Sequence, residues 1–418
     1  MQSYERSQVD ALVERLNEPV SRIIAIFGPR QCGKTTIVHQ ALAKVPYPFR
    51  YEAVDQPPAR EPAGPVRPAV AEVRSAASPR GTEWLVGVWQ QCAEEAARFG
   101  SKFVLVLDEI QKIPQWSETV KGLWDADRVS GCPLHVVVLG SAPMRIEADL
   151  TESLAGRFER IRATHWSFDE MRGAFGFDCD EFVFYGGYPG AAGMRSNFER
   201  WRAYVTDALI EPHLERDILG MARVDKPALL RQLLELGCMY SGQELSYKKM
   251  RGRLEDAGHE STLARYLRFL SAAGLLTGLF KHSGTPLQQR SSSPKLNVLN
   301  TALMSAVVGL DFDDSREDRH HWGRIVESAV GAHLVNTASS ATNVRYWRDG
   351  GQEVDFVLQR GPRLVGIEVK AGRSRPRHSS MMEFERRFSA SDSIVVGDTG
   401  VPLHEFLSEP ADHWLRSP

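Results

Sequence analysis

One stretch near the amino terminus, from Arg22 to Val45, constrains the fold more than any other part of the chain. It opens with the apolar run Ile23 to Phe27, whose lack of alternation predicts a strand buried on both faces of a parallel sheet. The segment Gly28-Pro-Arg-Gln-Cys-Gly-Lys-Thr follows and fits the pattern GxxxxGK[ST] at every fixed position. Apolar residues at helical spacing come next. This order of strand, loop and helix is the context in which the pattern forms a phosphate-binding loop.

The loop predicts an ATP site, because its glycines let backbone N–H groups turn toward phosphate oxygens at the start of a helix. Lys34 would place a positive charge beside the β- and γ-phosphates, and the Thr35 hydroxyl would ligate Mg²⁺. Thr36 would hydrogen-bond on the α-phosphate side. The predicted nucleotide-binding residues are Gly28, Pro29, Arg30, Gln31, Cys32, Gly33, Lys34, Thr35 and Thr36.

Two further apolar runs end in polar residues. Phe103 to Leu107 is followed by Asp108 and Glu109, and Leu134 to Leu139 is followed by Gly140 and Ser141. In an open parallel sheet, ligands bind at the carboxyl ends of the strands, so these side chains are expected beside the phosphates. We predict that Asp108 holds Mg²⁺, that Glu109 orients or deprotonates the attacking water, and that Ser141 senses the γ-phosphate. The alternative for the acidic pair is that it caps the next helix.

Several segments between about Arg22 and Ile218 resemble the AAA-superfamily P-loop ATPases of bacteria and archaea that carry a C-terminal domain of unknown function. The segments are GPRQCGKTT, LDEIQKIP, LGSAPM, SLAGRFERI, YGGYPG and LERDI. The resemblance implies ATP hydrolysis and a role for Arg157 at a phosphate, either within the chain or across the interface of a homo-oligomer. A solvated helix arginine is the alternative reading of Arg157, and Arg160 is the other arginine that could serve.

The middle of the chain changes character twice. Residues 56–80 are rich in Pro and Ala and predict a surface insertion, and residues 171–224 are expected to form a helical lid or connector. Residues 225–309 combine three helical patterns with two short strands, which predicts a winged helix-turn-helix module. Its basic residues are expected near DNA phosphates; the alternatives are that the module docks a protein and that these residues are simply solvated. The residues are Lys248, Lys249, Arg251, Arg253, Arg265 and Arg268.

The charged run of residues 310–322 has little to bury and is predicted to be a linker. It would precede a final α/β domain over residues 323–418. The ATPase domain itself is expected to span residues 1–170.

The final domain is expected to contain a cluster of charged residues. Glu327 lies within a predicted helix, Asp355 on a predicted strand, and Glu368 and Lys370 on the next strand. Residues two apart on a strand share a face, so Glu368 and Lys370 point the same way. Oxygen ligands from Glu327, Asp355 and Glu368 would suit Mg²⁺, or Mn²⁺ in its place, and the lysine could stabilise developing charge.

This segment resembles the PD-(D/E)XK nuclease core, with Val354 at the position of the proline. The resemblance implies metal-dependent cleavage of DNA. The alternatives that stay open are a simple same-face ion pair and an inactive nuclease fold that binds DNA or docks a protein partner without cutting.

Bulk composition excludes other classes of protein. The net charge of −2 argues against a uniformly basic nucleic-acid coat, and five cysteines without a CxxC pair give no zinc or disulfide framework. The polar amphipathic amino terminus is not a secretory signal, and no apolar run approaches the ~20 residues that cross a bilayer. We expect a cytoplasmic α/β protein with no membrane segment. Its predicted parts are a parallel-sheet P-loop AAA-type core, a winged-helix module and a C-terminal nuclease-like domain.

Overall fold

The structure is a computed structural model that describes residues 4–55, 80–140, 153–219, 224–283, 292–371, 378–388 and 392–415. The chain divides into two compact units. The N-terminal unit comprises Glu5–Gly28 and Gly33–Ala163, and the C-terminal unit comprises Met1–Tyr4, Pro29–Cys32 and Thr164–Pro418. The predicted insertion lies outside the described residues except for Arg80, and so do residues 284–291 of the predicted winged-helix module.

The N-terminal unit is built on a five-stranded parallel sheet with the strand order β2-β3-β4-β1-β5. Its strands are β1 (Ile23–Phe27), β2 (Phe49–Ala53), β3 (Phe103–Asp108), β4 (Leu134–Gly140) and β5 (Phe158–Arg162). Its helices are α1 (Ser7–Asn17), α2 (Lys34–Lys44), α3 (Thr82–Phe99), η1 (Ile110–Lys112) and α4 (Trp116–Ser130). The three strands predicted from unbroken apolar runs are confirmed, and β1, β3 and β4 are buried along their whole length.

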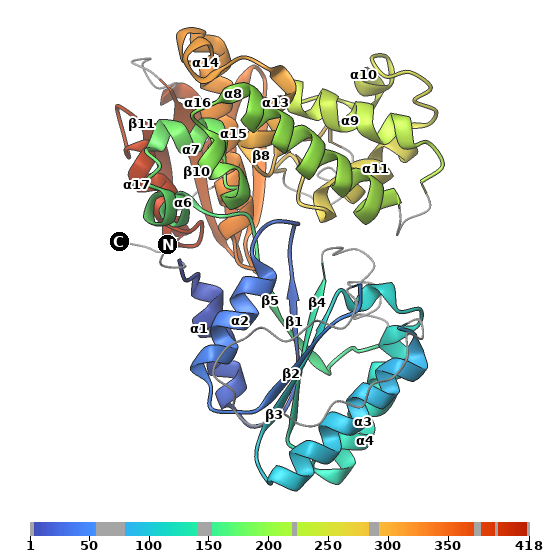
Figure 1. Ribbon diagram of the computed structural model, residues 1–418. Coiled ribbons are helices and arrows are strands. Elements are labelled where there is room, and N and C mark those ends of the chain that lie inside the picture. The colour runs from blue at the N-terminus through green and yellow to red at the C-terminus, as the bar shows by residue number, and fades with distance from the viewer. Residues whose placement is uncertain are drawn as a thin grey trace. The chain divides into compact units, whose positions relative to one another are not determined.

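Alternate residues of β1 explain why both faces of this sheet are covered. Ile23, Ala25 and Phe27 pack into one core with α3 and α4. Ile24 and Ile26 point to the opposite face and are equally buried. Figure 1 shows α1 and α2 on one side of the sheet and α3 and α4 on the other.

The C-terminal unit contains the remaining elements. Its helices are α6 (Phe168–Phe175), α7 (Cys179–Tyr185), η2 (Pro189–Met194), α8 (Phe198–Ala203), η3 (Tyr204–Ile210), η4 (His213–Leu219), α9 (Pro227–Met239), α10 (Tyr247–Arg251), α11 (Glu260–Ala272), α13 (Thr301–Val308), α14 (Phe312–Glu317), α15 (Arg319–Thr337), α16 (His378–Phe388), α17 (Leu403–Ser408) and η5 (His413–Leu415). Its strands are β6 (Leu276–Leu279), β7 (Lys295–Val298), β8 (Asn343–Asp349), β9 (Gln352–Arg360), β10 (Arg363–Lys370) and β11 (Asp392–Gly397).

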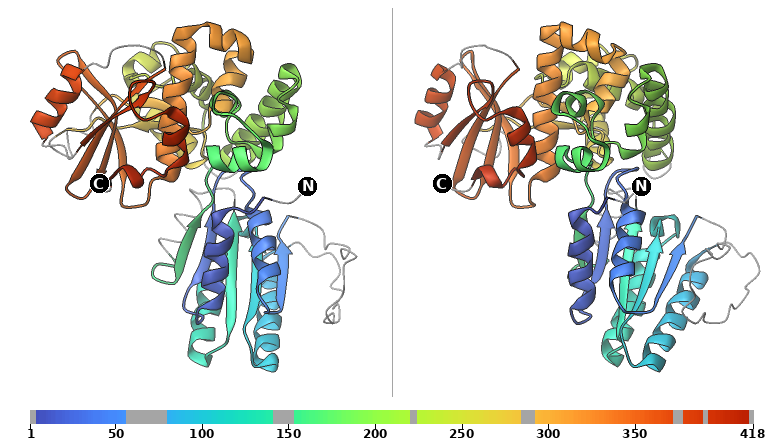
Figure 2. Two further views of the ribbon diagram at one scale, coloured as in Figure 1. Left: turned by 90° about the vertical axis from the view of Figure 1, so that its left-hand side faces the viewer. Right: turned by 60° about the vertical axis from the view of Figure 1, so that its left-hand side comes forward.

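Two sheets organise this unit. Strands β6 and β7 form an antiparallel pair after the helices α9, α10 and α11, so the elements expected over residues 225–309 are present. The other sheet has the order β11-β10-β9-β8, and its neighbours β9 and β10 are the strands predicted to carry Asp355 and the pair Glu368 and Lys370. Phe356 and Leu358 on β9 pack with α15, whereas Val357 packs with α16 on the other face. Figure 2 shows helices on both sides of this sheet.

The segment predicted to be a linker is helical instead. Asp311 caps α14, and Asp318 caps α15 by accepting hydrogen bonds from backbone N–H groups of the first turn. Phe312 also gives the segment something to bury, because its ring lies 5.5 Å from that of Phe184 and 5.8 Å from that of Tyr185. Two capping aspartates and one aromatic anchor therefore overturn the reading based on charge alone.

A substitution at Phe312 tests this correction. Phe312→Ala should lower the free energy of unfolding by about 2 kcal/mol, since a half-buried aromatic side chain loses its ring contacts. The measurement is urea unfolding followed by circular dichroism. Leu310→Ala is the matched control, because Leu310 is exposed and should change stability little. Equal, negligible effects of both substitutions would support a linker after all.

Among the described residues, no helix has the length and apolar character needed to span a membrane.

Candidate functional site

The register of the parallel sheet brings the predicted nucleotide residues together at one edge. Phe27 at the end of β1 lies opposite Gly140 of β4, and Leu139 of the same strand lies opposite Asp108 of β3. Within the edge so formed, the Thr35 hydroxyl donates a hydrogen bond to Asp108 Oδ2 at 3.2 Å. The two groups that the sequence predicts around Mg²⁺ are thus neighbours, and both supply the oxygen ligands that Mg²⁺ prefers.

The loop that follows β1 depends on both of its motif glycines. A Cβ atom on Gly28 would lie 1.6 Å from the Ala163 carbonyl oxygen, so no side chain fits there. Gly33 has φ 88°, a left-handed conformation that favours glycine, and it precedes the first turn of α2. The buried Lys34 ammonium donates to the Gly28 carbonyl at 3.0 Å and therefore lies folded back over the loop.

The tip of the loop, Pro29–Cys32, clusters with the C-terminal unit. Within that unit the Arg30 backbone N–H donates to His213 Nε2 at 3.0 Å, and the Cys32 carbonyl accepts a hydrogen bond from Trp166 Nε1 at 3.1 Å. Gln31 adopts φ 62°, a second left-handed position in the loop. Thr36 is exposed at the start of α2.

Glu109 occupies a strained position beside Asp108. It has φ 55°, which is left-handed and uncommon for a residue with a side chain. The buried Gln111 side chain donates to Glu109 Oε2 at 2.6 Å and holds the carboxylate. Glu109 does not serve as a side-chain cap for the short helix η1, so the capping alternative is not what the structure shows.

Sequence reasoning missed Gln111, and it also missed Tyr51 on β2. The Tyr51 hydroxyl donates to the same oxygen of Asp108 that accepts from Thr35, and its ring stacks on His39 at 4.7 Å. Burial, with a smaller contribution from Asp108, raises the pKa of Tyr51. The short spacing of Gln111 from the acidic pair is a signal that could have been found, whereas Tyr51 lies more than fifty residues away in sequence.

Arg157 lies at the opposite edge of the sheet from the loop. Its carbonyl accepts from the Ile23 backbone N–H at 2.8 Å, at the amino end of β1. The length of β1, about 13 Å for five residues, separates it from the phosphate-binding end. Its guanidinium pairs with Asp125 at 2.7 and 2.9 Å. This placement contradicts a role for Arg157 at the phosphates of its own chain, while action across a subunit interface stays a prediction.

Two other residues were predicted at this site, Arg160 and Ser141. Arg160 lies in the middle of β5, in register with Ala25. Ser141 lies outside the described residues.

The Arg157–Asp125 pair generates a direct test. Arg157→Ala and Asp125→Ala should each leave the ATP turnover of the purified protein unchanged, because the pair lies away from the loop. Steady-state ATPase rates across a range of protein concentrations check this. A loss confined to Arg157→Ala and dependent on protein concentration would instead establish an arginine acting between subunits.

The C-terminal unit brings together three of the four residues predicted at its own site. The Asp355 carboxylate accepts from the Val369 backbone N–H at 2.8 Å, which ties β9 to β10. The Lys370 ammonium lies 2.5 Å from Glu368 Oε1, so the two side chains share a face as expected. Glu327 on α15 joins this group electrostatically, although its nearest ionic partner is a residue that the sequence did not predict.

That residue is Lys295, the first of β7. Its ammonium lies 2.5 Å from Glu327 Oε1, 3.8 Å from Asp355 Oδ1 and 4.0 Å from Glu353 Oε1. It is 1% exposed. We call Lys295, Glu327, Glu353 and Asp355, with Glu368 and Lys370, the C-terminal charged cluster. In the sequence, Lys295 could have been suspected only from its place beside the apolar residue Leu296 at the start of a strand.

The environment of the C-terminal charged cluster shifts several pKa values. Burial raises the pKa of Glu327 to about 7, although Lys295 opposes this rise. Burial, together with Asp355, raises the pKa of Glu368. For Lys295 burial favours a lower pKa, but Glu327 and Asp355 outweigh it and the pKa is raised. Lys295 is therefore charged at neutral pH.

The carboxylates do not meet as a ready metal site. Among the residues that the structure describes, no three His, Cys, Asp or Glu side chains are placed to hold one metal ion. The predicted metal ligands Glu327, Asp355 and Glu368 would have to move to do so. A lysine ammonium, rather than an open space, lies where Glu327 and Asp355 face each other.

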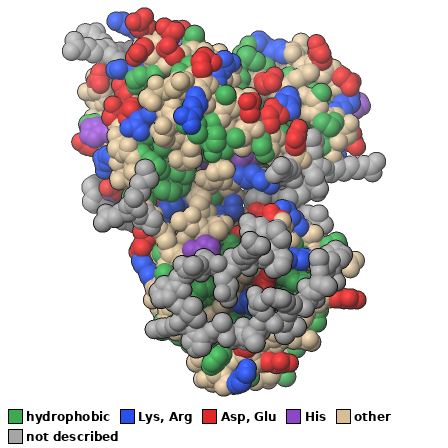
Figure 3. All heavy atoms as spheres, viewed as in Figure 1, with side chains coloured by type: hydrophobic (Ala, Val, Ile, Leu, Met, Phe, Trp, Pro, Cys, Tyr) green, Lys and Arg blue, Asp and Glu red, His purple; other side chains and the backbone are tan. Residues whose placement is uncertain are grey.

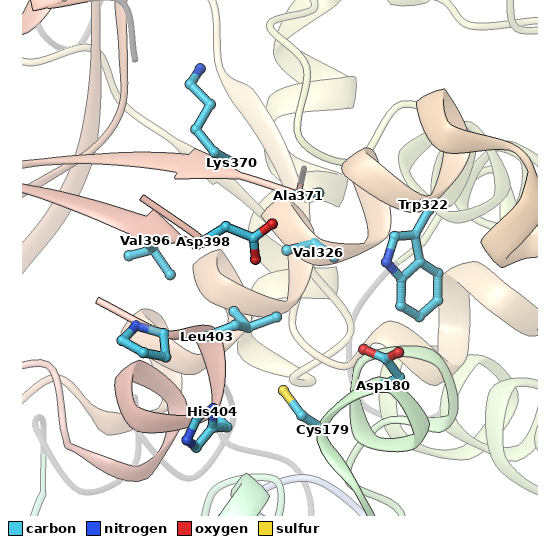
Figure 4. A pocket seen from close by; sticks show the side chains of 12 residues that line it. Cys179, Asp180, Trp322, Val326, Lys370, Ala371, Val396, Asp398, Leu403 and His404 are labelled. Carbon is cyan, nitrogen blue, oxygen red and sulfur yellow. The ribbon is translucent and has the colours of Figure 1, made fainter. Parts of the chain in front are cut away.

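A pocket of about 430 Å³ lies next to β10 and is lined partly by Asp180, Trp322, Lys370 and Asp398. Figure 4 shows the Lys370 side chain directed away from Asp398, Val326 and Leu403. Of the C-terminal charged cluster, Lys370 is the member among the residues that line this pocket.

The basic residues predicted near DNA are mostly on the surface. Lys248, Lys249 and Arg251 are exposed on α10. Arg265 is paired with Asp225 at 3.0 Å, and the Arg253 guanidinium lies over the Tyr240 ring at 4.6 Å. On the face shown in Figure 3, basic and acidic side chains are interspersed. DNA binding by these residues stays a prediction.

Three segments of the chain match models of known protein families, and the first of them contains the predicted ATP site. Residues 20–172 match a family model described as an AAA domain. The N-terminal segment thus carries an AAA domain. Residues 176–314 match the domain of unknown function DUF8612, and residues 322–406 match the domain of unknown function DUF4143. The AAA match covers the P-loop, Asp108 and Glu109, whereas the two other matches bring no function with them.

Individual relatives are distant. A UPF0102 protein of Cereibacter sphaeroides is 27% identical over 101 residues, which are 23% of this chain and 83% of that protein. Two solved structures are similar with a TM-score of 0.31 each. The Aeropyrum pernix ORC1 protein in complex with DNA is 12% identical over 75% of this chain and 94% of its own. A Thermotoga maritima RuvB variant is 16% identical over 66% and 86% of the two chains.

Proposed function

We propose that the AAA domain binds ATP with Mg²⁺ and hydrolyses it, and that its nucleotide state acts on the C-terminal modules. The observation that carries this proposal is the hydrogen bond between Thr35 and Asp108, which joins the end of the phosphate-binding loop to the end of β3. The match of residues 20–172 to an AAA domain supports it independently.

Each residue of the site has a step in this mechanism. Backbone N–H groups of the loop bind the phosphates, and Lys34 leaves the Gly28 carbonyl to reach the β- and γ-phosphates. Thr35 and Asp108 would hold Mg²⁺, which neutralises charge on the phosphates when bound. Glu109 orients the attacking water and accepts its proton, while Gln111 holds the Glu109 carboxylate in place until it is needed.

Two substitutions separate binding from hydrolysis. Glu109→Gln should keep ATP affinity but lower kcat by about 100-fold, because the amide accepts no proton. Lys34→Ala should weaken both ATP binding and turnover. Titration with a fluorescent ATP analogue and a phosphate-release assay measure the two quantities. Glu94→Gln, an exposed acid on α3, is the matched control, and turnover of Glu109→Gln at the parent rate would remove Glu109 from its proposed role.

A second candidate function is metal-dependent cleavage of DNA by the C-terminal unit. Asp355, Glu368 and Lys370 favour it, because two adjacent strands bring them to one place in the order that resembles the PD-(D/E)XK core. Here Asp355 and Glu368 would hold Mg²⁺ or Mn²⁺, and Lys370 would stabilise the charge that develops on the phosphate. The competing proposal is that an inactive nuclease-like fold and the helical module of residues 225–309 dock a protein partner.

Incubation of supercoiled plasmid with the purified protein and Mn²⁺ discriminates between these candidates. Cleavage predicts nicked circles that Asp355→Ala and Lys370→Ala abolish, while Asp392→Ala, an exposed acid on β11, cuts at the parent rate. Intact plasmid with the parent protein favours docking. Undiminished nicking by Asp355→Ala and Lys370→Ala would exclude this site as the origin of the activity.

A further inference from the structure

Lys295 is a charged residue of the protein interior that neither proposed reaction uses. Its side chain is 1% exposed. It enters from β7, in the segment that matches DUF8612, whereas the carboxylates around it lie in the segment that matches DUF4143. Removing an ammonium from water is costly unless anions surround it. The burial of the Lys295 ammonium must therefore be offset by the groups that surround it.

Negatively polarised groups surround the Lys295 ammonium. Besides its ion pairs with Glu327, Asp355 and Glu353, it donates to the Asp355 backbone carbonyl at 3.1 Å. The face of the Phe356 ring lies beneath it, with the ammonium 4.8 Å from the ring centre. The carbonyl, the carboxylates and the aromatic face come from α15 and β9, so one cation holds two elements of the C-terminal unit together.

The spacing around this ammonium suits a nitrogen cation and not a bound metal. Mg²⁺ requires oxygen ligands at about 2.1 Å, and the Asp355 and Glu353 oxygens lie 3.8 and 4.0 Å from the ammonium. We propose that Lys295 is a tethered cation that takes, among Glu327, Asp355 and Glu353, the place that a divalent metal would otherwise hold. The C-terminal charged cluster is therefore assembled without metal, and a metal can enter only where this ammonium leaves.

The rest of the C-terminal charged cluster contains carboxylate oxygens that its lysines do not fully compensate. Glu368 is buried, and the Lys370 ammonium lies 2.5 Å from its Oε1 atom. The Glu368 Oε2 atom is buried and accepts no hydrogen bond within the described part of the chain. Arg348 lies 3.9 Å from Glu353 and balances one further carboxylate. Withdrawal of Lys295 would thus leave Glu327 and Asp355 without this ionic partner, next to the carboxyl group of Glu368.

Replacement of the ammonium by an apolar side chain of similar length tests the proposal. The measurement is binding of Mn²⁺ to the full chain without nucleotide. Binding is monitored as the loss of the free Mn²⁺ signal in electron paramagnetic resonance. Lys295→Met should bind Mn²⁺ at least about tenfold more tightly than the parent, because carboxylates that lose their cation recruit another. Lys295→Arg keeps the charge and should resemble the parent. Adding Asp355→Asn to Lys295→Met should abolish the gain and locate it.

Two results would overturn the proposal. One is Mn²⁺ binding by the parent that requires Asp355 and is as tight as in Lys295→Met. The other is a folded Lys295→Met protein that gains no Mn²⁺ binding. Folding is checked by circular dichroism and by the midpoint of thermal unfolding, which Mn²⁺ should raise in Lys295→Met and not in the parent.

If Lys295→Met is too unstable, the double variant Lys295→Met/Glu327→Gln answers the same question. It removes the cation together with its closest anion, so its melting temperature should exceed that of Lys295→Met alone. A double variant no more stable than the single one would contradict the counter-ion role.

The inference builds on the proposed C-terminal site but not on its chemistry. Mn²⁺ binding reports the tethered cation, and plasmid nicking reports cleavage. A protein that fails to nick can still show the gain of binding in Lys295→Met. Nicking by the parent that requires Asp355 would mean that metal binds there while Lys295 is in place, so it would support cleavage and count against the tethered cation.

Discussion

The hydrogen bond from Thr35 to Asp108 is the interaction on which the proposed activity depends. It exists because β1, β4 and β3 run parallel and in register, so that the residues following β1 and the last residue of β3 meet at one edge. Both faces of these strands are buried, so a slip of one residue would exchange the side chains of the two cores, and the close packing of each core opposes that exchange. The positions of Lys34 and Glu109 follow from the same alignment.

In the C-terminal unit the constraint is electrostatic, because several carboxylates lie near one another in the interior. There, carboxylates from α15 and β9 are brought close enough to repel one another, and the buried Lys295 ammonium compensates them. The apolar packing of α15 and α16 on the two faces of the sheet supplies the scaffold, but the charged positions need the cation from β7 to stay together. Segments that match two separate domains of unknown function thereby share one cluster.

Local patterns predicted much of this fold, and contacts distant in sequence account for what they missed. The bounds of β1 matched the apolar run, because a strand buried on both faces leaves an unbroken pattern. Asp355, Glu368 and Lys370 could be placed together because a short turn joins their strands. Lys295 could not, since it lies 32 residues from Glu327 and 60 from Asp355. The sequence could not decide whether Arg157 reaches the phosphates of its own chain, because that depends on its pairing with the amino end of β1, a contact distant in sequence.

A structure of the protein determined with Mg²⁺ and a non-hydrolysable ATP analogue tests the central claim most directly. The account predicts a triphosphate bound by backbone N–H groups of the loop, with Lys34 moved from the Gly28 carbonyl to the phosphates. It also predicts Mg²⁺ between the Thr35 hydroxyl and the Asp108 carboxylate. An empty or collapsed loop under saturating nucleotide, with the Thr35–Asp108 hydrogen bond unchanged, would contradict it.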